Sequence, residues 1–170
     1  MEFERYEIEP RVSEEDAETA FNSLVVELKN RKQTLAVAES CTGGLIGKLI
    51  TDVSGASTVF VGGMITYTNH IKISKLGVSA DTVERFTEVS AECAAEMATR
   101  AREFFESDFG ISATGFAGPT GESERDPLGT VYVGISERGR ARVYRLSFGD
   151  IGREKVRLGT AIFAAKNIFR

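Results

Sequence analysis

A short apolar run that ends in a glycine-rich turn constrains the fold of this chain more than any other segment. Thr34 to Ala38 has the character of a buried strand, and the apolar residues after the turn recur at helical spacing, at Leu45, Ile46, Leu49 and Ile50. Between them lies Glu39-Ser40-Cys41-Thr42-Gly43-Gly44. In open α/β sheets, ligands collect at the carboxyl ends of strands. We therefore expect this turn to form the floor of an active site.

Further helices and strands alternate along the chain. Capping residues and helical spacing predict helices over 13–31, 71–76, 80–85, 90–104 and 153–169. The helix that begins at Ser90 is expected to turn Cys93, Ala94, Met97, Ala101 and Phe104 inward. Strands are predicted over 57–68, with a bulge or close backbone approach at Gly62-Gly63, and over 109–114. Segments 129–136 and 141–148 flank a turn-prone sequence and predict an antiparallel hairpin.

The composition is that of one globular domain. A chain of 170 residues with 42% apolar side chains can bury one sizeable core. We expect a single domain over 1–170, made of a core over 34–170 and the preceding helix over 13–31. Because helices alternate with strands and a hairpin lies near the end, the predicted fold is α/β, with a mixed sheet covered on both faces.

The charge and hydropathy of the chain argue against several classes of protein. A net charge of −4 and an isoelectric point near 5.2 give no electrostatic reason to approach nucleic acid or an anionic membrane. No apolar run approaches the roughly 20 residues that cross a bilayer, and the acidic start from Met1 to Asp16 is unlike a secretory signal peptide. We expect a cytoplasmic protein with neither nucleic-acid nor membrane partners.

Histidine and cysteine are scarce. His70 is the single histidine, so a metal site or phosphoryl-transfer centre with several histidines cannot be built. It lies among polar residues after a predicted strand, where an ordinary exposed histidine is favoured over a catalytic base. Cys41 and Cys93 lie far apart and match no metal or redox spacing. We therefore expect reduced thiols and no metal site.

The two glycine-rich segments do not match common nucleotide-binding motifs. In the first, the leading glycine of a phosphate loop would fall at Thr42, and Leu49 stands where that motif has serine or threonine. In the second, Gly115, Gly118 and Gly121 are spaced by three throughout, unlike the dinucleotide fingerprint. These glycines indicate either close backbone approach to a different ligand or simple turns.

Ser40 has two interpretations. A serine in a strand-to-helix turn often caps the helix by accepting hydrogen bonds from its unpaired N–H groups. Here Thr42 can supply that cap, and Gly43 and Gly44 leave the helix N-terminus open to an anion or a carbonyl oxygen. Ser40 is then free to act as a nucleophile.

A serine nucleophile needs a base, and His70 is unsuited to that role. The remaining options are a lysine kept neutral by burial or by positive neighbours, and a tyrosine relay. Tyr67 and Lys72 are the candidates, although residue type alone favours a solvated helix-face charge for Lys72. Sequence spacing by itself does not bring Lys72 to Ser40.

Several short motifs, in a fixed order, resemble those of one family. They are Ala38-Glu39-Ser40-Cys41-Thr42-Gly43-Gly44, Thr66-Tyr67-Thr68-Asn69 with Lys72, Leu76-Gly77-Val78, Val89-Ser90, Thr114-Gly115-Phe116-Ala117-Gly118-Pro119 and Pro127-Leu128-Gly129-Thr130-Val131. From about Thr34 to its end, the sequence resembles the C-terminal domain of the competence/damage-inducible protein CinA. The resemblance implies a three-layer α/β/α sandwich.

The same resemblance implies a reaction. Active members of the family hydrolyse nicotinamide mononucleotide to nicotinic acid mononucleotide and ammonia in pyridine-nucleotide recycling, without cofactor or metal. By position, Ser40 would be the nucleophile, Lys72 its base and Tyr67 a partner in proton handling, with Thr114 assisting at the developing charge. The expected substrate-binding residues are Thr42, Gly43, Gly44, Asn69, Gly115, Gly118, Arg153 and Arg157. The helix N-terminus after Ser40 would hold either the oxyanion or the phosphate.

The sequence departs from the family pattern at two places. Glu122 stands where the family commonly has glycine, and a carboxylate there could repel a phosphate. Gly152 precedes Arg153, whereas the family often places arginine directly after the aspartate. These departures keep open a nucleotide-binding or regulatory module without turnover, and a structural interaction domain is a third interpretation. Phenylalanine and methionine on the predicted helices and an open hairpin edge indicate a homo-oligomer, although core packing explains both equally.

Overall fold

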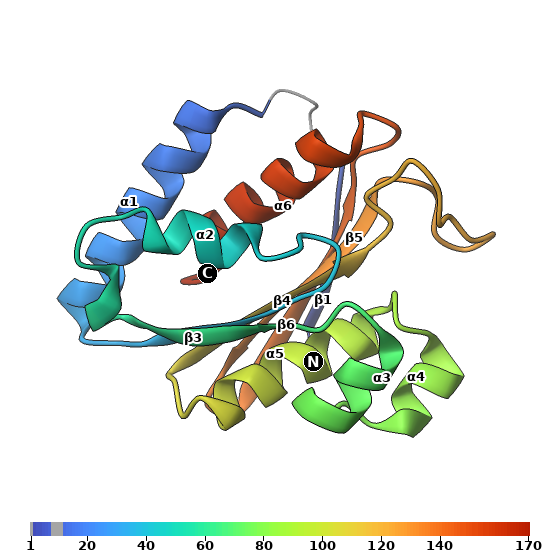
Figure 1. Cartoon of the computed structure of the whole chain (residues 1–170), viewed down its shortest axis with the longest axis horizontal. Helices are drawn as coiled ribbons and strands as arrows, with labels where there is room; N and C mark the ends of the chain where they lie inside the picture. Colours follow the sequence, from blue (N-terminus) through green and yellow to red (C-terminus); the bar gives the residue numbers. More distant parts are fainter. Residues whose placement is uncertain (1, 8–11) are drawn as a thin grey trace.

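A six-stranded mixed sheet organises the chain (Figure 1). The computed structural model describes residues 2–7 and 12–170. The strands lie in the order β1-β6-β5-β4-β2-β3. Their bounds are β1 Glu2–Glu7, β2 Leu35–Glu39, β3 Phe60–Ile65, β4 Phe109–Gly115, β5 Thr130–Glu137 and β6 Arg140–Ser147. β5 pairs antiparallel with β4 and β6, which confirms the predicted hairpin, and the other pairs are parallel.

Helices cover both faces of this sheet and complete a three-layer α/β/α sandwich (Figure 1). One face carries α1 (Glu14–Arg31), α2 (Leu45–Thr51) and α6 (Arg153–Asn167). The other carries α3 (Asn69–Ile71), the π-helical turn η2 (Lys72–Leu76), α4 (Ala80–Phe86) and α5 (Ala91–Phe104). A 3₁₀ turn, η1 (Ala56–Thr58), precedes β3. Among the described residues, no helix is both long and apolar enough to span a membrane.

Side-chain caps start two of the predicted helices where the sequence indicated. The Ser13 hydroxyl accepts a hydrogen bond from the Asp16 N–H at 3.1 Å and begins α1. The Ser90 hydroxyl accepts one from the Cys93 N–H, also at 3.1 Å, and begins α5. The buried face of α5 is the predicted one except at Phe104, which is 59% exposed. Phe104 is the last residue of the helix.

α5 packs directly on the backbone of the sheet because glycines open the way. A Cβ built on Gly110 of β4 would overlap the carbonyl oxygen of Ala98, and one on Gly134 of β5 would overlap that of Ala94. The close fit places the beginning of α5, and the segment before it, against the middle of the sheet. The segment before α5 contributes Glu88 and Val89 to the candidate site.

β3 is shorter than the strand predicted over 57–68. The residues at its start form η1, and those after Ile65 turn away toward α3. The expected irregularity is present, because Leu35 pairs with Phe60 and Ala36 with Gly62, which leaves Val61 as an extra residue. The close approach at Gly63 is also present, since a Cβ there would overlap the Val37 side chain.

β1 is a strand that the sequence patterns do not predict. It pairs in parallel with β6 along its whole length. The Phe3 ring stacks on Tyr132 with centroids 6.3 Å apart, and the Tyr6 ring meets Phe163 edge-on at 5.1 Å. β1 therefore covers the β6 edge of the hairpin, which was expected to be open. That expectation was wrong, and the hairpin gives no indication of self-association. Among the described residues, the two edge strands of the sheet are β1 and β3.

Replacing Gly134 with alanine tests the direct packing of α5 on the sheet. The new methyl group would overlap the Ala94 carbonyl and the Ser112 hydroxyl, so the free energy of unfolding should fall by about 3 kcal/mol. Gly139→Ala is the control, because Gly139 has φ +80° but open space around it, and only about 1 kcal/mol should be lost. Urea denaturation measures both, and equal losses would contradict the close approach.

Candidate active site

The carboxyl ends of β2, β3 and β4 bring together the three segments that the sequence singled out. The Ser40 N–H donates to the Ala113 carbonyl of β4 at 2.9 Å. The Thr66 N–H, just past β3, donates to the Glu39 carbonyl at 2.7 Å. Parallel pairing therefore places Ser40 between the residues that follow β3 and those that end β4. The location agrees with the general rule for open α/β sheets.

Lys72 lies on the face of the sheet opposite to α2, and its side chain extends to Ser40 at the end of β2 (Figure 1). Its Nζ atom donates to the Ser40 Oγ atom at 3.0 Å and to the Thr66 carbonyl at 2.9 Å. Only 1% of Lys72 and 8% of Ser40 is exposed. The interpretation of Lys72 as a solvated helix-face charge is therefore wrong. Lys72 is the first residue of the π-helical turn η2, and such turns occur frequently at functional sites.

Burial lowers the pKa of Lys72 below its usual value of 10.5. The low-polarity surroundings disfavour the ammonium form, and this effect outweighs the nearby Glu88 carboxylate, which favours it. A lysine of lowered pKa is neutral in a larger fraction of molecules near neutral pH, so it can accept the proton of an adjacent hydroxyl. The Ser40–Lys72 contact has the geometry and the electrostatics of a nucleophile–base pair.

Cys41 follows Ser40 directly but differs from it in chemistry. Burial raises the pKa of the Cys41 thiol to about 12, and the same cause raises the pKa of Cys93 to about 12. Both are free and buried, as the sequence led us to expect of reduced thiols. A thiol needs to ionise before it attacks, so Cys41 stays inert at neutral pH and Ser40 is the candidate nucleophile.

The N-terminus of α2 is occupied by a carboxylate rather than open. Glu39 is 1% exposed, and its Oε2 atom accepts from the N–H groups of Gly44 at 3.0 Å and Ile46 at 3.1 Å. Its Oε1 atom accepts from the Gly47 N–H at 2.8 Å. The expectations that Thr42 caps this helix and that an oxyanion or phosphate binds its N-terminus were therefore wrong. The hydroxyl of Thr42 is buried without a hydrogen-bond partner among the described residues.

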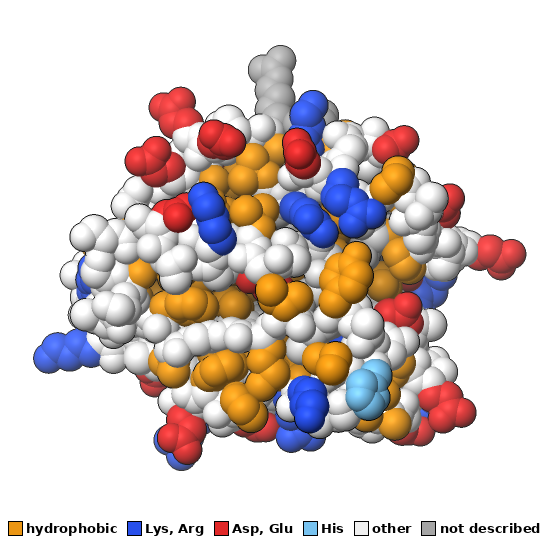
Figure 2. Space-filling model, viewed as in Figure 1, with side chains coloured by type: hydrophobic (Ala, Val, Ile, Leu, Met, Phe, Trp, Pro, Cys, Tyr) orange, Lys and Arg blue, Asp and Glu red, His pale blue; other side chains and the backbone are white. Residues whose placement is uncertain are grey.

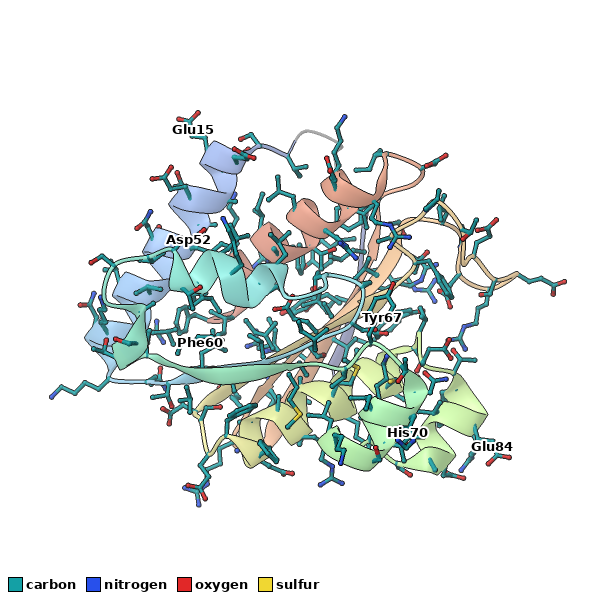
Figure 3. All side chains as sticks on the ribbon, in the orientation of Figure 1. Glu15, Asp52, Phe60, Tyr67, His70 and Glu84 are labelled. Atoms are coloured by element: carbon teal, nitrogen blue, oxygen red, sulfur yellow. The ribbon has the colours of Figure 1, made fainter. Side chains whose placement is uncertain are left out.

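A pocket of about 240 Å³ opens beside Ser40 and Lys72. Its lining includes six of the other predicted site residues: Tyr67, Asn69, Thr114, Gly115, Gly118 and Arg153. Figure 3 labels Tyr67 just beyond the end of β3, next to the helical layer that carries His70. Tyr67 is 58% exposed, so one wall of the pocket faces solvent.

Four predicted binding residues lie elsewhere. Thr42, Gly43, Gly44 and Arg157 line a separate groove of about 960 Å³ between α1, α2 and α6. The Arg157 Nε atom donates to the Cys41 carbonyl at 2.7 Å, so this guanidinium holds the Ser40 turn from behind. Arg153, at the first turn of α6, is the arginine that lines the Ser40 pocket.

Thr114 and the glycine after it have mainly structural contacts. The Thr114 hydroxyl donates to the Glu88 carbonyl at 2.7 Å, which fixes the segment before α5. A Cβ on Gly115 would overlap the Thr130 carbonyl of β5, so glycine is needed there for strand packing. Gly118 has φ +95°, a conformation that glycine adopts readily, and turns the loop around the pocket.

Three important carboxylates were missed by sequence reasoning. Glu39 caps α2, and its position at the end of an apolar strand was the available signal. Glu88 lines the pocket, and no local pattern marks it. Asp126 is 2% exposed and accepts hydrogen bonds from Tyr132 at 2.9 Å and Arg145 at 3.2 Å, which anchors the loop between β4 and β5, part of which lines the pocket.

His70 and Glu122 lie away from the Ser40–Lys72 pair. His70 is exposed on α3, within 3.4 Å of the Ser74 hydroxyl, as expected for an ordinary surface histidine. Glu122 is exposed in the loop between β4 and β5 and does not line the pocket. Within residues 2–7 and 12–170, no three histidine, cysteine or carboxylate side chains gather as potential metal ligands.

Comparisons with known proteins assign the family. The family described as "CinA C-terminal domain" matches residues 17–170. The chain belongs to this family. A CinA-like protein of Geotalea daltonii is 47% identical over 161 residues, which are 94% of this chain and 38% of that protein. A putative competence-damage inducible protein of Halothermothrix orenii is 50% identical over 125 residues, which are 72% of this chain and 30% of that protein. The chain thus spans between 30% and 38% of the length of these curated relatives.

Solved structures of the CinA family share the fold. The competence/damage inducible protein CihA from Agrobacterium tumefaciens superposes with a TM-score of 0.89 at 34% identity, over 94% of this chain and 97% of that one. A CinA superfamily protein from Escherichia coli superposes with a TM-score of 0.87 at 30% identity, over 94% and 92% of the two chains. The three-layer fold that the resemblance implied is thereby confirmed.

Replacing Glu39 with glutamine tests the buried cap of α2. The amide has a single acceptor oxygen, and its NH₂ group would face N–H donors, so the free energy of unfolding should fall by about 2–3 kcal/mol. Chemical denaturation provides the measurement. Asp52→Asn, which removes an exposed carboxylate paired with Lys48, should change stability by only about 0.5 kcal/mol. A Glu39→Gln effect no larger than that of the control would contradict the cap.

The lowered pKa of Lys72 predicts a pH-dependent stability. Between the folded-state pKa and the usual value of 10.5, the unfolded chain binds the extra proton, so the stability contributed by this residue rises with pH across that window. Lys72→Met should abolish that rise and be at least as stable as the wild type at pH 7. Urea unfolding at stepped pH measures it, with the exposed Lys75→Met as control. An unaltered pH slope in Lys72→Met would refute the lowered pKa.

Proposed function

We propose that this domain is an amidohydrolase that converts nicotinamide mononucleotide to nicotinic acid mononucleotide and ammonia. The observation that carries the proposal is the buried hydrogen bond of 3.0 Å between the Lys72 Nζ atom and the Ser40 Oγ atom. Hydrolysis of a carboxamide requires a nucleophile and a base that later protonates the departing nitrogen. A lysine of lowered pKa beside a serine supplies both functions.

The first half of the reaction forms a covalent intermediate. Neutral Lys72 takes the hydroxyl proton of Ser40, while the Oγ atom bonds to the carboxamide carbon and the carbonyl π pair moves onto oxygen. When the resulting tetrahedral species collapses, the C–N bond breaks and Lys72 gives its proton to the nitrogen. Ammonia leaves, and the acyl group, which still carries the ribose phosphate on its ring nitrogen, stays on Ser40 as an ester.

The second half returns the enzyme to its starting state. A water molecule loses a proton to Lys72 and attacks the ester carbon, and the Ser40 oxygen takes the proton back as it leaves. The net change adds water across the C–N bond and needs no oxidant or metal. Because Glu39 fills the α2 N-terminus, the oxyanion must be stabilised from the pocket side of Ser40.

Tyr67 serves the substrate side of the site in this proposal. Among the described residues, no hydrogen bond joins its hydroxyl to Ser40 or Lys72, and the ring is 58% exposed on the pocket wall. The phenol is therefore placed to contact a bound molecule, and its contribution to proton transfer would arise only after that molecule binds. Asn69 lines the same wall.

The phosphate of the mononucleotide is assigned to Arg153. Of the two arginines predicted for this role, Arg157 is committed to the Cys41 carbonyl and faces the other groove. Arg153 lines the Ser40 pocket from the N-terminal turn of α6, where the helix dipole also favours an anion. The face of the molecule drawn in Figure 2 carries basic side chains beside apolar ones near its centre, although the chain is acidic overall.

Ammonia release from nicotinamide mononucleotide tests the proposed function. The purified protein should release ammonia, and Ser40→Ala or Lys72→Met should lower kcat by about a thousandfold. Ser74→Ala, a change to an exposed hydroxyl on η2, is the matched control and should retain the wild-type rate. Full activity in Ser40→Ala would contradict the mechanism. Nucleotide binding without any ammonia release would favour the module without turnover instead.

A further inference from the structure

Glu88 gives the Ser40 pocket a negative charge that the proposed mechanism does not use. It is the one acidic residue among the described residues that line this pocket, and its side chain is half-buried. Its single hydrogen-bond partner among the described residues is the Asn69 amide, at 3.5 Å. Within residues 2–7 and 12–170, no lysine or arginine forms an ion pair with the Glu88 carboxylate. The carboxylate is therefore available to a ligand.

The backbone around Glu88 is held in a fixed and strained conformation. Thr87 has φ +72°, which a β-branched residue rarely adopts. Its hydroxyl donates to the Val89 carbonyl at 3.1 Å, and its own carbonyl accepts from the Ser90 hydroxyl at 2.9 Å. The Glu88 carbonyl accepts from Thr114 at 2.7 Å. Such strain is maintained where the surrounding contacts fix a functional residue, and here they fix Glu88 on the pocket wall.

Glu88 does not belong to the proton-transfer pair. Among the described residues, no hydrogen bond or ion pair joins its carboxylate to Ser40 or Lys72. Its effect on Lys72 is purely electrostatic and favours the ammonium form, which opposes the role of Lys72 as a base. The carboxylate therefore does not assist Lys72 as a base, and its position on the pocket wall suggests a role in recognising the substrate.

The remaining lining residues indicate what this carboxylate recognises. Two aromatic residues, Tyr67 and Phe116, line the same pocket, and aromatic faces attract cations. Arg153 supplies a positive charge in that pocket. The pocket thus combines a carboxylate and two aromatic rings with one guanidinium. This pattern is complementary to a small molecule that carries one cationic ring and one anionic group.

We propose that Glu88, Tyr67 and Phe116 form a subsite for a quaternary pyridinium ring. This inference rests on the proposed function and specifies its selectivity. In nicotinamide mononucleotide the ring nitrogen is bonded to the ribose, so the ring carries a permanent positive charge, while the phosphate is negative. Reduction of the ring removes the positive charge but keeps the ribose, the phosphate and the carboxamide. Glu88 therefore makes the site select the oxidised, cationic form.

Calorimetric titration with the oxidised and the reduced mononucleotide tests this subsite. The titrations use the Ser40→Ala protein, which does not hydrolyse the ligand; it should bind the oxidised form roughly tenfold or more tightly than the reduced form at the same pH, and the further changes are made in this background. Glu88→Gln keeps the size and polarity of the side chain, and should weaken only the oxidised ligand, so that the two affinities agree within about threefold. Glu88→Ala should remove the same preference, which guards against an effect peculiar to the amide.

Glu84→Gln is the matched control, because Glu84 is exposed on α4 and does not line the pocket (Figure 3). It should keep the preference of the Ser40→Ala protein. Equal weakening of both ligands in Glu88→Gln, an unchanged preference in that variant, or no binding of either ligand by the Ser40→Ala protein would each overturn the subsite.

Ammonia release by the wild type is measured separately and keeps the two proposals distinguishable. Ring selectivity that depends on Glu88, without ammonia release, would leave the subsite standing and refute the amidohydrolase. Ammonia release combined with a preference that Glu88→Gln does not change would refute the subsite alone.

Discussion

The burial of the Glu39 carboxylate beneath α2 is the constraint on which the site depends. A buried charge is tolerated because three N–H groups of the helix start donate to its two oxygens. The same bonds fix where α2 begins and therefore how the intervening turn leaves β2. Arg157 holds the turn from behind through the Cys41 carbonyl. Ser40 is thereby freed from capping and is presented to the pocket.

The Ser40–Lys72 pair follows from this arrangement and from the path of the chain after β3. The chain turns through α3 into a single π-helical turn, which directs Lys72 back beneath the ends of the strands. There the Lys72 Nζ atom donates to the Ser40 hydroxyl and the Thr66 carbonyl, while burial lowers the pKa of Lys72 and disfavours its charged form. Irregular backbone at η2 and Thr87 thus coincides with the residues that carry the chemistry.

Periodicity and capping residues predicted most of the fold, because helix starts such as Ser13 and the alternation of strands are local properties. β1 could not be predicted, since its acidic sequence gains a place in the sheet only through distant partners such as Tyr132 and Phe163. The cap of α2 was misassigned because sequence spacing favours Thr42, whereas in the structure the Glu39 carboxylate accepts hydrogen bonds from the first N–H groups of that helix. The burial of Lys72 and the separation of Arg153 from Arg157 depend on tertiary packing, which no local pattern encodes.

Rapid-quench mass spectrometry of the protein mixed with nicotinamide mononucleotide tests the central claim most directly. If the Ser40 oxygen attacks the carboxamide, early time points should contain an ester between Ser40 and the carboxyl group of nicotinic acid mononucleotide, and this adduct should be absent from Lys72→Met. Steady release of nicotinic acid mononucleotide by a Ser40→Ala variant, with no adduct on the wild-type protein, would contradict a serine nucleophile activated by a buried lysine.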